Sequence, residues 1–495
     1  MLTCSRSKPM TKFRNAMLLC LALASALSGA STIASTQTTD RLESLTETPP
    51  PAPAPRTLNI HAWKSLTGSK VLFIRTTELP MLDLHVSFAA GSARDDQHPG
   101  LAATTFSLLN EGVQGQNLTQ ILETFDSLGA QLDMEINQER ASFSLRTLSA
   151  TNKRTPAVQL LTRILGQPLL AKEALVRVKT ELVDRLEKQQ TQPESQVGQA
   201  MNQLLFGTHP YAQPVYGTVQ SLPLISREQV QDFHKKYYNP GNVLITLVGD
   251  LSLDEAQRIS LQITDALPQT PAMAAPASPS QAQNPSTSRH IESPLNQTHL
   301  MLAQQGVTRK DPDYAALKVA NLIFAGSDPG SRLMKELRER RGLIYGVHMS
   351  TPNWQGHNPV SLSLQTSPEF SEGTLALIKD LFRDYLLEGP TQQELDDAKD
   401  LLRGVTALTS ASNAQILSGL FDISRHDLPF DLDFTVQQAL QLTTQQIKAA
   451  LNRHYSTEQW NVVTLGPTTP QQALPEPINQ PQQSLCRAGD ESVAS

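Results

Sequence analysis

The chain has 495 residues, of which 39% are hydrophobic, and its 41 basic and 47 acidic residues give a net charge of -6. Because single domains cluster near about 100–150 residues, this length allows two or more hydrophobic cores. The charge balance argues against a nucleic-acid-binding protein, which would show a basic stripe. The three cysteines, Cys4, Cys20 and Cys486, match neither a disulfide framework nor a Cys-x-x-Cys zinc site.

Residues 1–30 have the pattern of a secretory signal peptide. Lys12 and Arg14 precede an apolar stretch at 16–27, which is too short for a membrane span of about 20 residues. Small residues offer cleavage after Ala26 or Ala30, and a short anchor that is never cut is the alternative. We therefore expect an exported, periplasmic protein with no membrane contact beyond this segment.

Three polar tracts divide the rest of the chain. Residues 31–56 are polar and then proline-rich, and residues 268–290 have few large apolar side chains, so we expect a disordered lead-in and a linker. A disordered tail is predicted over 467–495. The ordered material then falls into two blocks of similar size, 57–267 and 291–466.

The first block begins with a half-buried strand in the stretch LDLHVSF (82–88). Its side chains alternate between two faces: Leu82, Leu84, Val86 and Phe88 on the buried one, and Asp83, His85 and Ser87 on the other. After Pro99 and Gly100, the stretch LAATTFSLL predicts a mostly buried helix.

A second helix is predicted over LTQILETFDSL, which ends at Gly129 and has one apolar stripe of Leu118, Ile121, Leu122 and Phe125. AQLDMEI and ASFSLRTL predict a hairpin around residues 137–139, and apolar helical stretches follow between about 156 and 205. Mixed helices and antiparallel strands indicate an α+β class, with helices packed on one face of a sheet.

The two blocks look like copies of one unit. The first ends in HKKYYNPGNVLITLVGD (234–250) and the second in LNRHYSTEQWNVVTLGP (451–467). Each places a tyrosine at the end of a helix-like segment, then a polar turn, then a β-branched strand closed by glycine. One short match is weak by itself, and the equal block sizes strengthen it.

The chain resembles the M16 (pitrilysin, or inverzincin) family of metallopeptidases. The resemblance rests on stretches in both blocks: ELPMLDLHVSFAAGSARDDQHPGLA, TFDSLGAQLD, HPYAQPVYGTVQSLPLISREQVQDFHKKYYNPGNVLITLVGDLSLDEA and SRLMKELRERRGLIYGV. It implies two homologous α+β halves joined by a linker, which close around an extended peptide.

Active members of this family carry His-x-x-Glu-His directly after Gly-Leu-Ala. Histidines at i and i+4 share one helix face and can hold zinc, and the glutamate polarises the bound water. Here Ala103, Phe106 and Ser107 occupy the three positions. The resemblance places the later acidic ligand near Asp184, with Glu181 one turn away, and both are expected to be solvated helix residues.

Histidines elsewhere offer no replacement for the missing ligands. None of the eleven are spaced four apart, and His98 and His209 lie in predicted turns, where a solvated or capping role is commoner than metal binding. We therefore expect no cofactor in this chain.

The resemblance also points to Arg338 and Tyr345. Active members use an arginine and a tyrosine seven residues apart here, after a helix that we predict from 331 to 341 and that Gly342 ends. A guanidinium and a phenol can donate to a peptide carbonyl and to its oxyanion. The alternative is a solvated arginine at a helix C-terminus and an ordinary strand tyrosine.

Some M16 enzymes have two chains, one with the zinc motif and one with the arginine-tyrosine pair, and this chain resembles the second kind. The expected function is that of a non-catalytic, peptide-binding subunit of an exported zinc peptidase, whose partner carries His-x-x-Glu-His and the zinc. A scaffold or peptide-binding protein with no catalytic role is the first alternative. The second is an autonomous hydrolase that holds zinc through Asp184, His98 and others.

Overall fold

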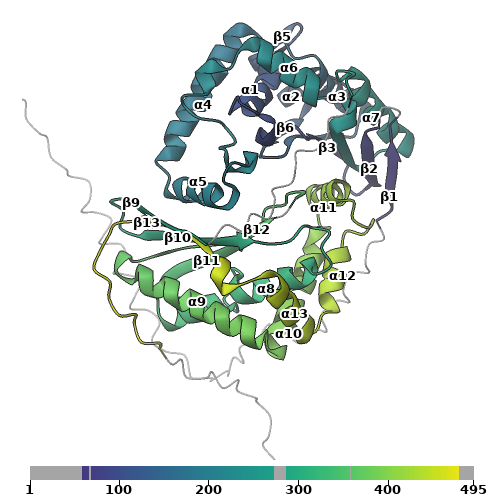
Figure 1. Cartoon of the computed structure of the whole chain (residues 1–495). Coiled ribbons are helices and arrows are strands. Elements are labelled where there is room, and N and C mark those ends of the chain that lie inside the picture. The colour runs from purple at the N-terminus through teal and green to yellow at the C-terminus, as the bar shows by residue number, and fades with distance from the viewer. Residues whose placement is uncertain (1–57, 66–67, 272–285, 357, 479–495) are drawn as a thin grey trace, which may run out of the picture. The chain divides into compact units, whose positions relative to one another are not determined.

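The predicted strand at residues 82–88 forms β3 (Met81–Phe88) inside a six-stranded sheet of order β1-β2-β8-β3-β7-β6. The computed structural model describes residues 58–65, 68–271, 286–356 and 358–478 (Figure 1). The predicted signal peptide and the lead-in therefore lie outside the described residues. All neighbouring strands of this sheet are antiparallel except β2 and β8. The other five strands are β1 (Ile60–Lys64), β2 (Lys70–Arg75), β6 (Gln131–Ile136), β7 (Ala141–Leu148) and β8 (Val243–Gly249).

Helices cover the apolar face of this sheet, where Leu82, Leu84, Val86 and Phe88 lie in the first core. The predicted hairpin is confirmed as β6 and β7, and so are the predicted helices, although Leu122 is 52% exposed and lies outside the buried stripe. The helices of the first half are α1 (Leu101–Leu108), α2 (Leu118–Leu128), α3 (Thr151–Gly166), α4 (Lys172–Gln190), α5 (Pro193–Phe206), α6 (Arg227–Tyr237) and α7 (Leu253–Ala266), and two short strands, β4 (Gly112–Val113) and β5 (Gln116–Asn117), precede α2.

The second half has a five-stranded sheet of order β11-β12-β10-β13-β9 over its own core. Its strands are β9 (Ser288–Glu292), β10 (Thr298–Gln305), β11 (Ile344–Ser350), β12 (Pro359–Thr366) and β13 (Asn461–Gly466). Its helices are α8 (Tyr314–Ala325), a π-helix (Met334–Arg340), α9 (Ser371–Glu388), α10 (Gln392–Thr409), α11 (Asn413–His426), α12 (Phe434–Leu440) and α13 (Thr444–His454).

The strand orders confirm that the halves are copies. The series β2-β8-β3-β7-β6 in the first sheet corresponds to β9-β13-β10-β12-β11 in the second. In each half the first strand of the series pairs in parallel with the last strand of that half, β8 or β13. These two last strands contain the matching sequences VLITLVG and NVVTLG.

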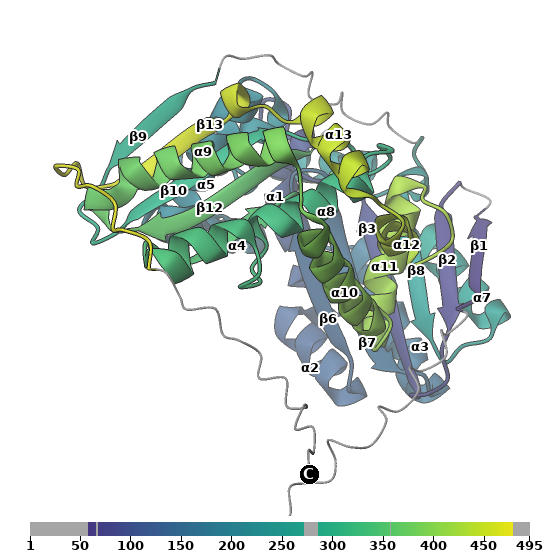
Figure 2. The same cartoon turned by 90° about the horizontal axis from the view of Figure 1, so that it is seen from below.

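Each half also contributes a helix to the other half's sheet. Helix α11 packs on β2, β8 and β3, where Ile416, Leu420 and Ile423 join Leu72 and Val248 in one apolar cluster (Figure 2). Helix α5 packs on β10 and β13 in the same way. As a result, the face of β3 that carries Asp83, His85 and Ser87 is covered, although alternation alone predicted an exposed face.

Two predicted boundaries need correction. Residues 288–290, assigned to the linker, form the start of β9, because their backbone pairs with β13. The tail predicted to be disordered is ordered over 467–478: the amide of Gln472 donates to the carbonyl of Glu369 at 2.8 Å, and that of Ile478 to Arg340 at 2.7 Å. Residues 272–285 and 479–495 lie outside the described part.

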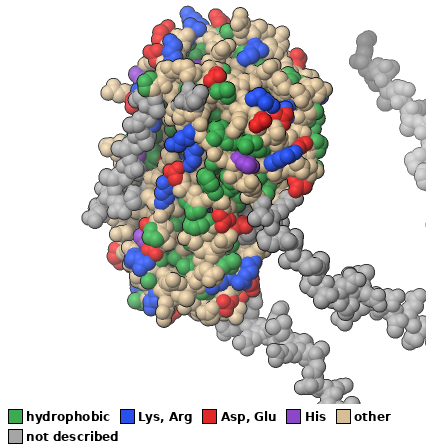
Figure 3. Space-filling model, turned by 90° about the vertical axis from the view of Figure 1, so that its right-hand side faces the viewer, with side chains coloured by type: hydrophobic (Ala, Val, Ile, Leu, Met, Phe, Trp, Pro, Cys, Tyr) green, Lys and Arg blue, Asp and Glu red, His purple; other side chains and the backbone are tan. Residues whose placement is uncertain are grey.

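The surface of the molecule reflects the nearly equal numbers of basic and acidic residues in the sequence. Basic and acidic side chains are interspersed on the face of the molecule that Figure 3 shows. Among the described helices, none combines the length and apolar character that a membrane crossing needs.

Candidate functional site

Helix α1 begins at a buried carboxylate. Gly100 has a left-handed conformation (φ 93°), and Asp95 accepts hydrogen bonds from the amides of Gly100 and Ala102, both at 2.7 Å. Burial raises the pKa of Asp95 to about 7, although the two amides favour the charged form. The helix is therefore firmly fixed at the place where active relatives would bind their metal.

The side chains at the motif positions belong to the hydrophobic core or lack a metal-binding group. Ala103 is fully buried, and the ring of Phe106 lies 5.3 Å from that of Phe143, centroid to centroid. Ser107 is only partly buried. Because zinc sites in proteins use thiolate, imidazole and carboxylate ligands, these three residues do not fit a zinc ion.

The acidic residues near α1 do not replace the ligands. Asp184 is exposed on α4, and Glu181 lies 3.6 Å from Arg177, which also pairs with Glu111. These carboxylates thus face guanidinium groups or solvent.

The two turn histidines behave as predicted. His209 accepts a hydrogen bond from the amide of Tyr211 at 3.2 Å and so caps a short 3-10 helix. His98 contacts the side-chain amide of Gln229. Within the described residues, the one group with metal-ligand geometry is Asp311, Asp313 and His454 in the second half. There Arg453 already binds both oxygens of Asp313, at 2.6 and 2.8 Å.

Arg338 and Tyr345, by contrast, come together. The guanidinium carbon of Arg338 lies 4.9 Å from the ring centroid of Tyr345. Both side chains are exposed, and Tyr345 is 86% accessible. Two nearby arginines form ion pairs with another residue. Arg340 and Arg341 donate to Glu336 at 2.5 and 2.8 Å.

Three local irregularities of the backbone place this pair. The segment that carries Arg338 is a π-helix, a form that is rare and frequent at functional sites. Gly342 then reverses the chain with φ 63°. On edge strand β11 the register shifts between Ile344 and Val347, which leaves Tyr345 in a bulge, a feature that re-aims side chains. The sequence predicted the helix and its end, and nothing in the spacing revealed the π-helix or the bulge.

The first half provides an internal comparison. Its equivalent turn has Gly129 with φ 64°, and counting from that glycine puts Phe125 and Leu132 at the positions of Arg338 and Tyr345. Phe125 is buried, Leu132 packs against the core, and β6 pairs with β7 without a register shift. Exposure of the pair is therefore a property of the second half and is not imposed by the fold.

Comparison with known proteins agrees with this architecture. Residues 70–219 match the family description "Insulinase (Peptidase family M16)", and residues 224–402 match "Peptidase M16 inactive domain". The chain belongs to the M16 family. The matches to an M16 inactive domain and to a non-peptidase homologue support a non-catalytic member, in agreement with an α1 that lacks the zinc ligands of active M16 peptidases.

Individual relatives extend over most of the chain. A crystal structure titled "peptidase M16 inactive domain from Pseudomonas fluorescens" is 43% identical, has a TM-score of 0.81, and covers 84% of this chain and all of that one. A Helicobacter pylori protein named "Non-peptidase homolog YmxG" is 24% identical over 78% of this chain and 88% of its own. An "Uncharacterized zinc protease" of Mycobacterium tuberculosis is 23% identical over 75% of this chain and 84% of its own.

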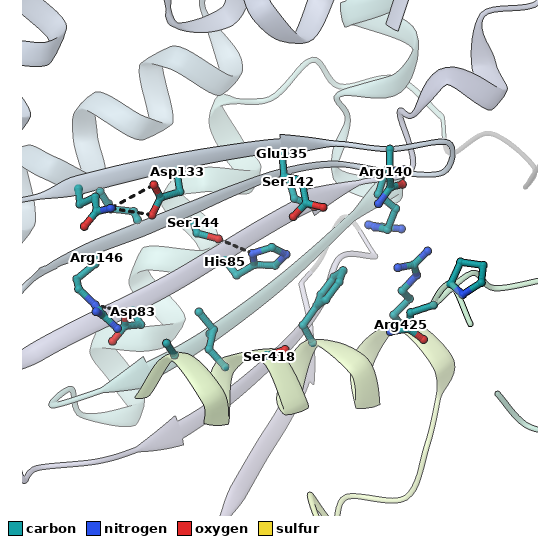
Figure 4. A pocket seen from close by; sticks show the side chains of 18 of the residues that line it. Asp83, His85, Asp133, Glu135, Arg140, Ser142, Ser144, Arg146, Ser418 and Arg425 are labelled. Atoms are coloured by element: carbon teal, nitrogen blue, oxygen red, sulfur yellow. Dashed lines mark hydrogen bonds and ion pairs between the residues drawn. The ribbon is translucent and has the colours of Figure 1, made fainter. Parts of the chain in front are cut away.

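A second feature was not found from the sequence. A polar cavity of about 650 Å³ lies between the covered face of the first sheet and α11 (Figure 4). Its lining includes His85, Arg140, Phe421 and Arg425. The sequence offered one partial signal: Asp83 and His85 lie on the side of β3 opposite its apolar residues, and both line the cavity. Its partner helix lies more than 300 residues along the chain, and no local pattern predicts that contact.

Proposed function

We propose that this chain is the non-catalytic, substrate-binding subunit of an exported M16-type zinc peptidase and that it supplies Arg338 and Tyr345 to a zinc-bearing partner. The proposal rests on the exposed contact between Arg338 on a π-helix and Tyr345 in a strand bulge, in a chain whose α1 has no metal ligand at the motif positions. The predicted signal segment supports export to the periplasm.

The chemistry of the pair suits stabilisation of negative charge. The guanidinium is a permanent cation with several N–H donors, and the phenol adds one O–H donor. Donors aimed at a developing oxyanion contribute about 10²–10³ in rate when placed in advance. The partner and its zinc would activate the attacking water, since Ala103, Phe106 and Ser107 of α1 offer no zinc ligands.

The alternative function, a peptide-binding or scaffold protein, is favoured by one observation. Arg338 and Tyr345 contact each other, and an exposed cation–π contact of about 0.5–1 kcal/mol can be a purely structural feature. On that view the pair would have no role in a partner's activity.

Reconstitution separates the two functions. The chain is purified together with whatever protein binds it, and the bound protein is examined for His-x-x-Glu-His. Hydrolysis of a fluorogenic peptide is then measured for each chain alone and for the mixture. We expect activity in the mixture that exceeds that of either chain alone. A stable complex whose activity equals that of the zinc-bearing chain by itself would support the scaffold function.

A further inference from the structure

The polar cavity has two different walls. One is the sheet face formed by β3, β7 and β6. The other is α11, whose Leu417, Phe421 and Arg425 recur at a spacing of four residues and so share one helix face, together with residues 352–354. Its volume of about 650 Å³ lies within the range of about 300–1,000 Å³ that is usual for ligand sites.

Two buried arginines lie at one end of this cavity (Figure 4). Arg140 donates from Nε to the Ser87 hydroxyl at 2.6 Å and from Nη2 to the Ser87 carbonyl at 2.5 Å. Arg425 donates from Nη2 to Glu139, while its buried Nε has no partner in the part of the chain that the structure describes. The Nη1 group of each arginine is not fully buried and makes no hydrogen bond to the described residues, so each guanidinium keeps donor capacity at this end of the cavity.

The negative charge at this end is insufficient for both arginines. Glu139 pairs with Arg425 and also accepts from Tyr211 and from the amide of Gln355. Burial, and then the charge of Arg425, lower the pKa of Arg140 to about 9. Because an uncompensated buried cation is costly, an additional carboxylate would be bound favourably here.

His85 and Phe421 extend the site toward its middle. The His85 ring lies 4.4 Å from that of Phe421, and its Nδ1 contacts the Ser144 hydroxyl at 2.8 Å. Its Nε2 is buried and has no partner among the described residues. Arg140 lies 5.9 Å from the same phenyl ring. Ligand atoms beside the anionic group would thus meet an aromatic surface.

The cavity has the opposite character away from the arginines. Asp133 of β6 lines it there and accepts from the neutral amide of Gln131, at 3.2 Å (Figure 4). Asp83 is paired with Arg146 at 2.7 Å. The cavity is therefore basic at one end and acidic at the other, where Asp133 lies.

We propose that this polar cavity binds a short peptide by its free C-terminal carboxylate, held between Arg140 and Arg425, with a basic group of the peptide near Asp133. Guanidinium groups recognise carboxylates by paired, charge-assisted hydrogen bonds. A small inorganic anion would leave most of the volume empty, and a polyanion would be repelled by the acidic side. The site gives the peptide binding of the proposed function, on which it rests, a definite place in the fold, and it can be tested by itself because it requires no partner and no metal.

Calorimetric titration of the purified full chain tests the assignment. The probe is a five-residue peptide with an N-terminal lysine, an apolar middle and a free C-terminal carboxylate, and it is compared with the same peptide as its C-terminal amide. We expect the amide to bind about 10- to 100-fold more weakly, the loss typical of one or two charge-assisted hydrogen bonds. This comparison needs no variant and therefore no assumption about folding.

Variants locate the binding. Arg140→Lys should bring the affinities of acid and amide closer together, while Arg403→Ala, which changes an exposed arginine paired with Asp400 on α10, should change neither. Asp133→Asn should reduce the advantage of a lysine over an alanine at the peptide's first position.

Three results would overturn the assignment: no peptide binding, equal binding of acid and amide, or full competition by inorganic phosphate at the peptide's own concentration. Tyr345→Phe should leave this binding unchanged, so failure here is distinguishable from failure of the proposed function.

Discussion

Glu139, in the turn between β6 and β7, forms a buried ion pair with Arg425 of α11, 286 residues further along the chain. The hydroxyl of Tyr211 and the backbone amide of Gln355 donate to the same carboxylate. Burial and the adjacent carboxylate raise the pKa of Tyr211, which keeps its hydroxyl protonated as a donor. One side chain of the first half thus contacts α11 and the loop between β11 and β12 in the second half.

Removal of this carboxylate should be strongly destabilising. Glu139→Ala leaves the Arg425 guanidinium buried without its counter-charge, a change that typically costs about 3–5 kcal/mol. We expect a large fall in the urea midpoint, followed by circular dichroism. Glu123→Ala, at an exposed position on α2, is the control and should shift stability by less than about 0.5 kcal/mol. A midpoint for Glu139→Ala equal to that control would contradict the role given to the pair.

His85 should make stability depend on pH in one direction. Burial, and then the positive charge of Arg140, lower the pKa of His85 from 6.5 to about 4. The folded protein keeps this ring neutral, whereas the unfolded chain binds a proton as the pH falls below 6.5. The resulting stabilisation is complete above pH 6.5 and is lost as the pH falls toward 4.

Comparison with His85→Gln isolates this effect from other titrating groups. The difference in unfolding free energy between wild type and variant should decrease by up to about 3 kcal/mol from pH 7.5 to pH 4. Urea titrations at several pH values measure it. A difference that stays constant with pH would show that His85 titrates normally in the folded state.

Restoration of the family motif should not restore a zinc site. The triple variant Ala103→His, Phe106→Glu and Ser107→His puts a carboxylate against the ring of Phe143 and a larger side chain at a fully buried position. Buried unpaired charge and overpacking are both costly, so we expect a loss of at least about 3 kcal/mol and no stoichiometric zinc by elemental analysis. One zinc ion per chain with unchanged stability would refute the account of α1. Of the three single changes, Ser107→His should reduce stability least, because Ser107 is partly exposed.

Sequence patterns predicted those parts of the fold that depend on local periodicity. The strand at 82–88, the hairpin and the glycines that end two helices all follow from the alternation of side chains and from positive-φ positions. Local patterns did not predict that α11 covers β3, because this contact depends on the tertiary packing of residues such as Leu420 against strands of the other half. Leu122 was misassigned for the same reason: a helical stripe shows which residues align and not how wide the covered face is.

The candidate site was predicted in part. The positions Arg338 and Tyr345 came from family spacing, and their contact agrees with it. Neither the π-helix nor the bulge has a periodic signature, since each adds one residue to an otherwise regular element. The basic end of the polar cavity lacked any signal, because Arg140 and Arg425 meet only through the exchange of helices between halves.

The turn at Gly342 should matter for activity more than for stability. Its φ of 63° favours glycine, and the space that a Cβ would take has nothing within 4 Å, so Gly342→Ala introduces backbone strain of about 1 kcal/mol without a clash. Gly129→Ala is a matched control, with φ 64° and the same open space. We expect similar small losses of stability and a fall in partner-dependent peptide hydrolysis for Gly342→Ala only. Equal activity of the two variants would show that the conformation of this turn does not affect the function of Arg338 and Tyr345.

The most direct test of the central claim is the peptidase activity of the reconstituted complex with Tyr345→Phe in this chain. The change removes one hydroxyl and keeps the ring that Arg338 contacts, so fold and complex formation should be unaffected. Lys335→Ala, at an exposed position of the same π-helix, is the control. We predict a fall in kcat of about 10²–10³ for Tyr345→Phe and none for the control. Full activity of the Tyr345→Phe complex would contradict the claim that this chain completes its partner's active site.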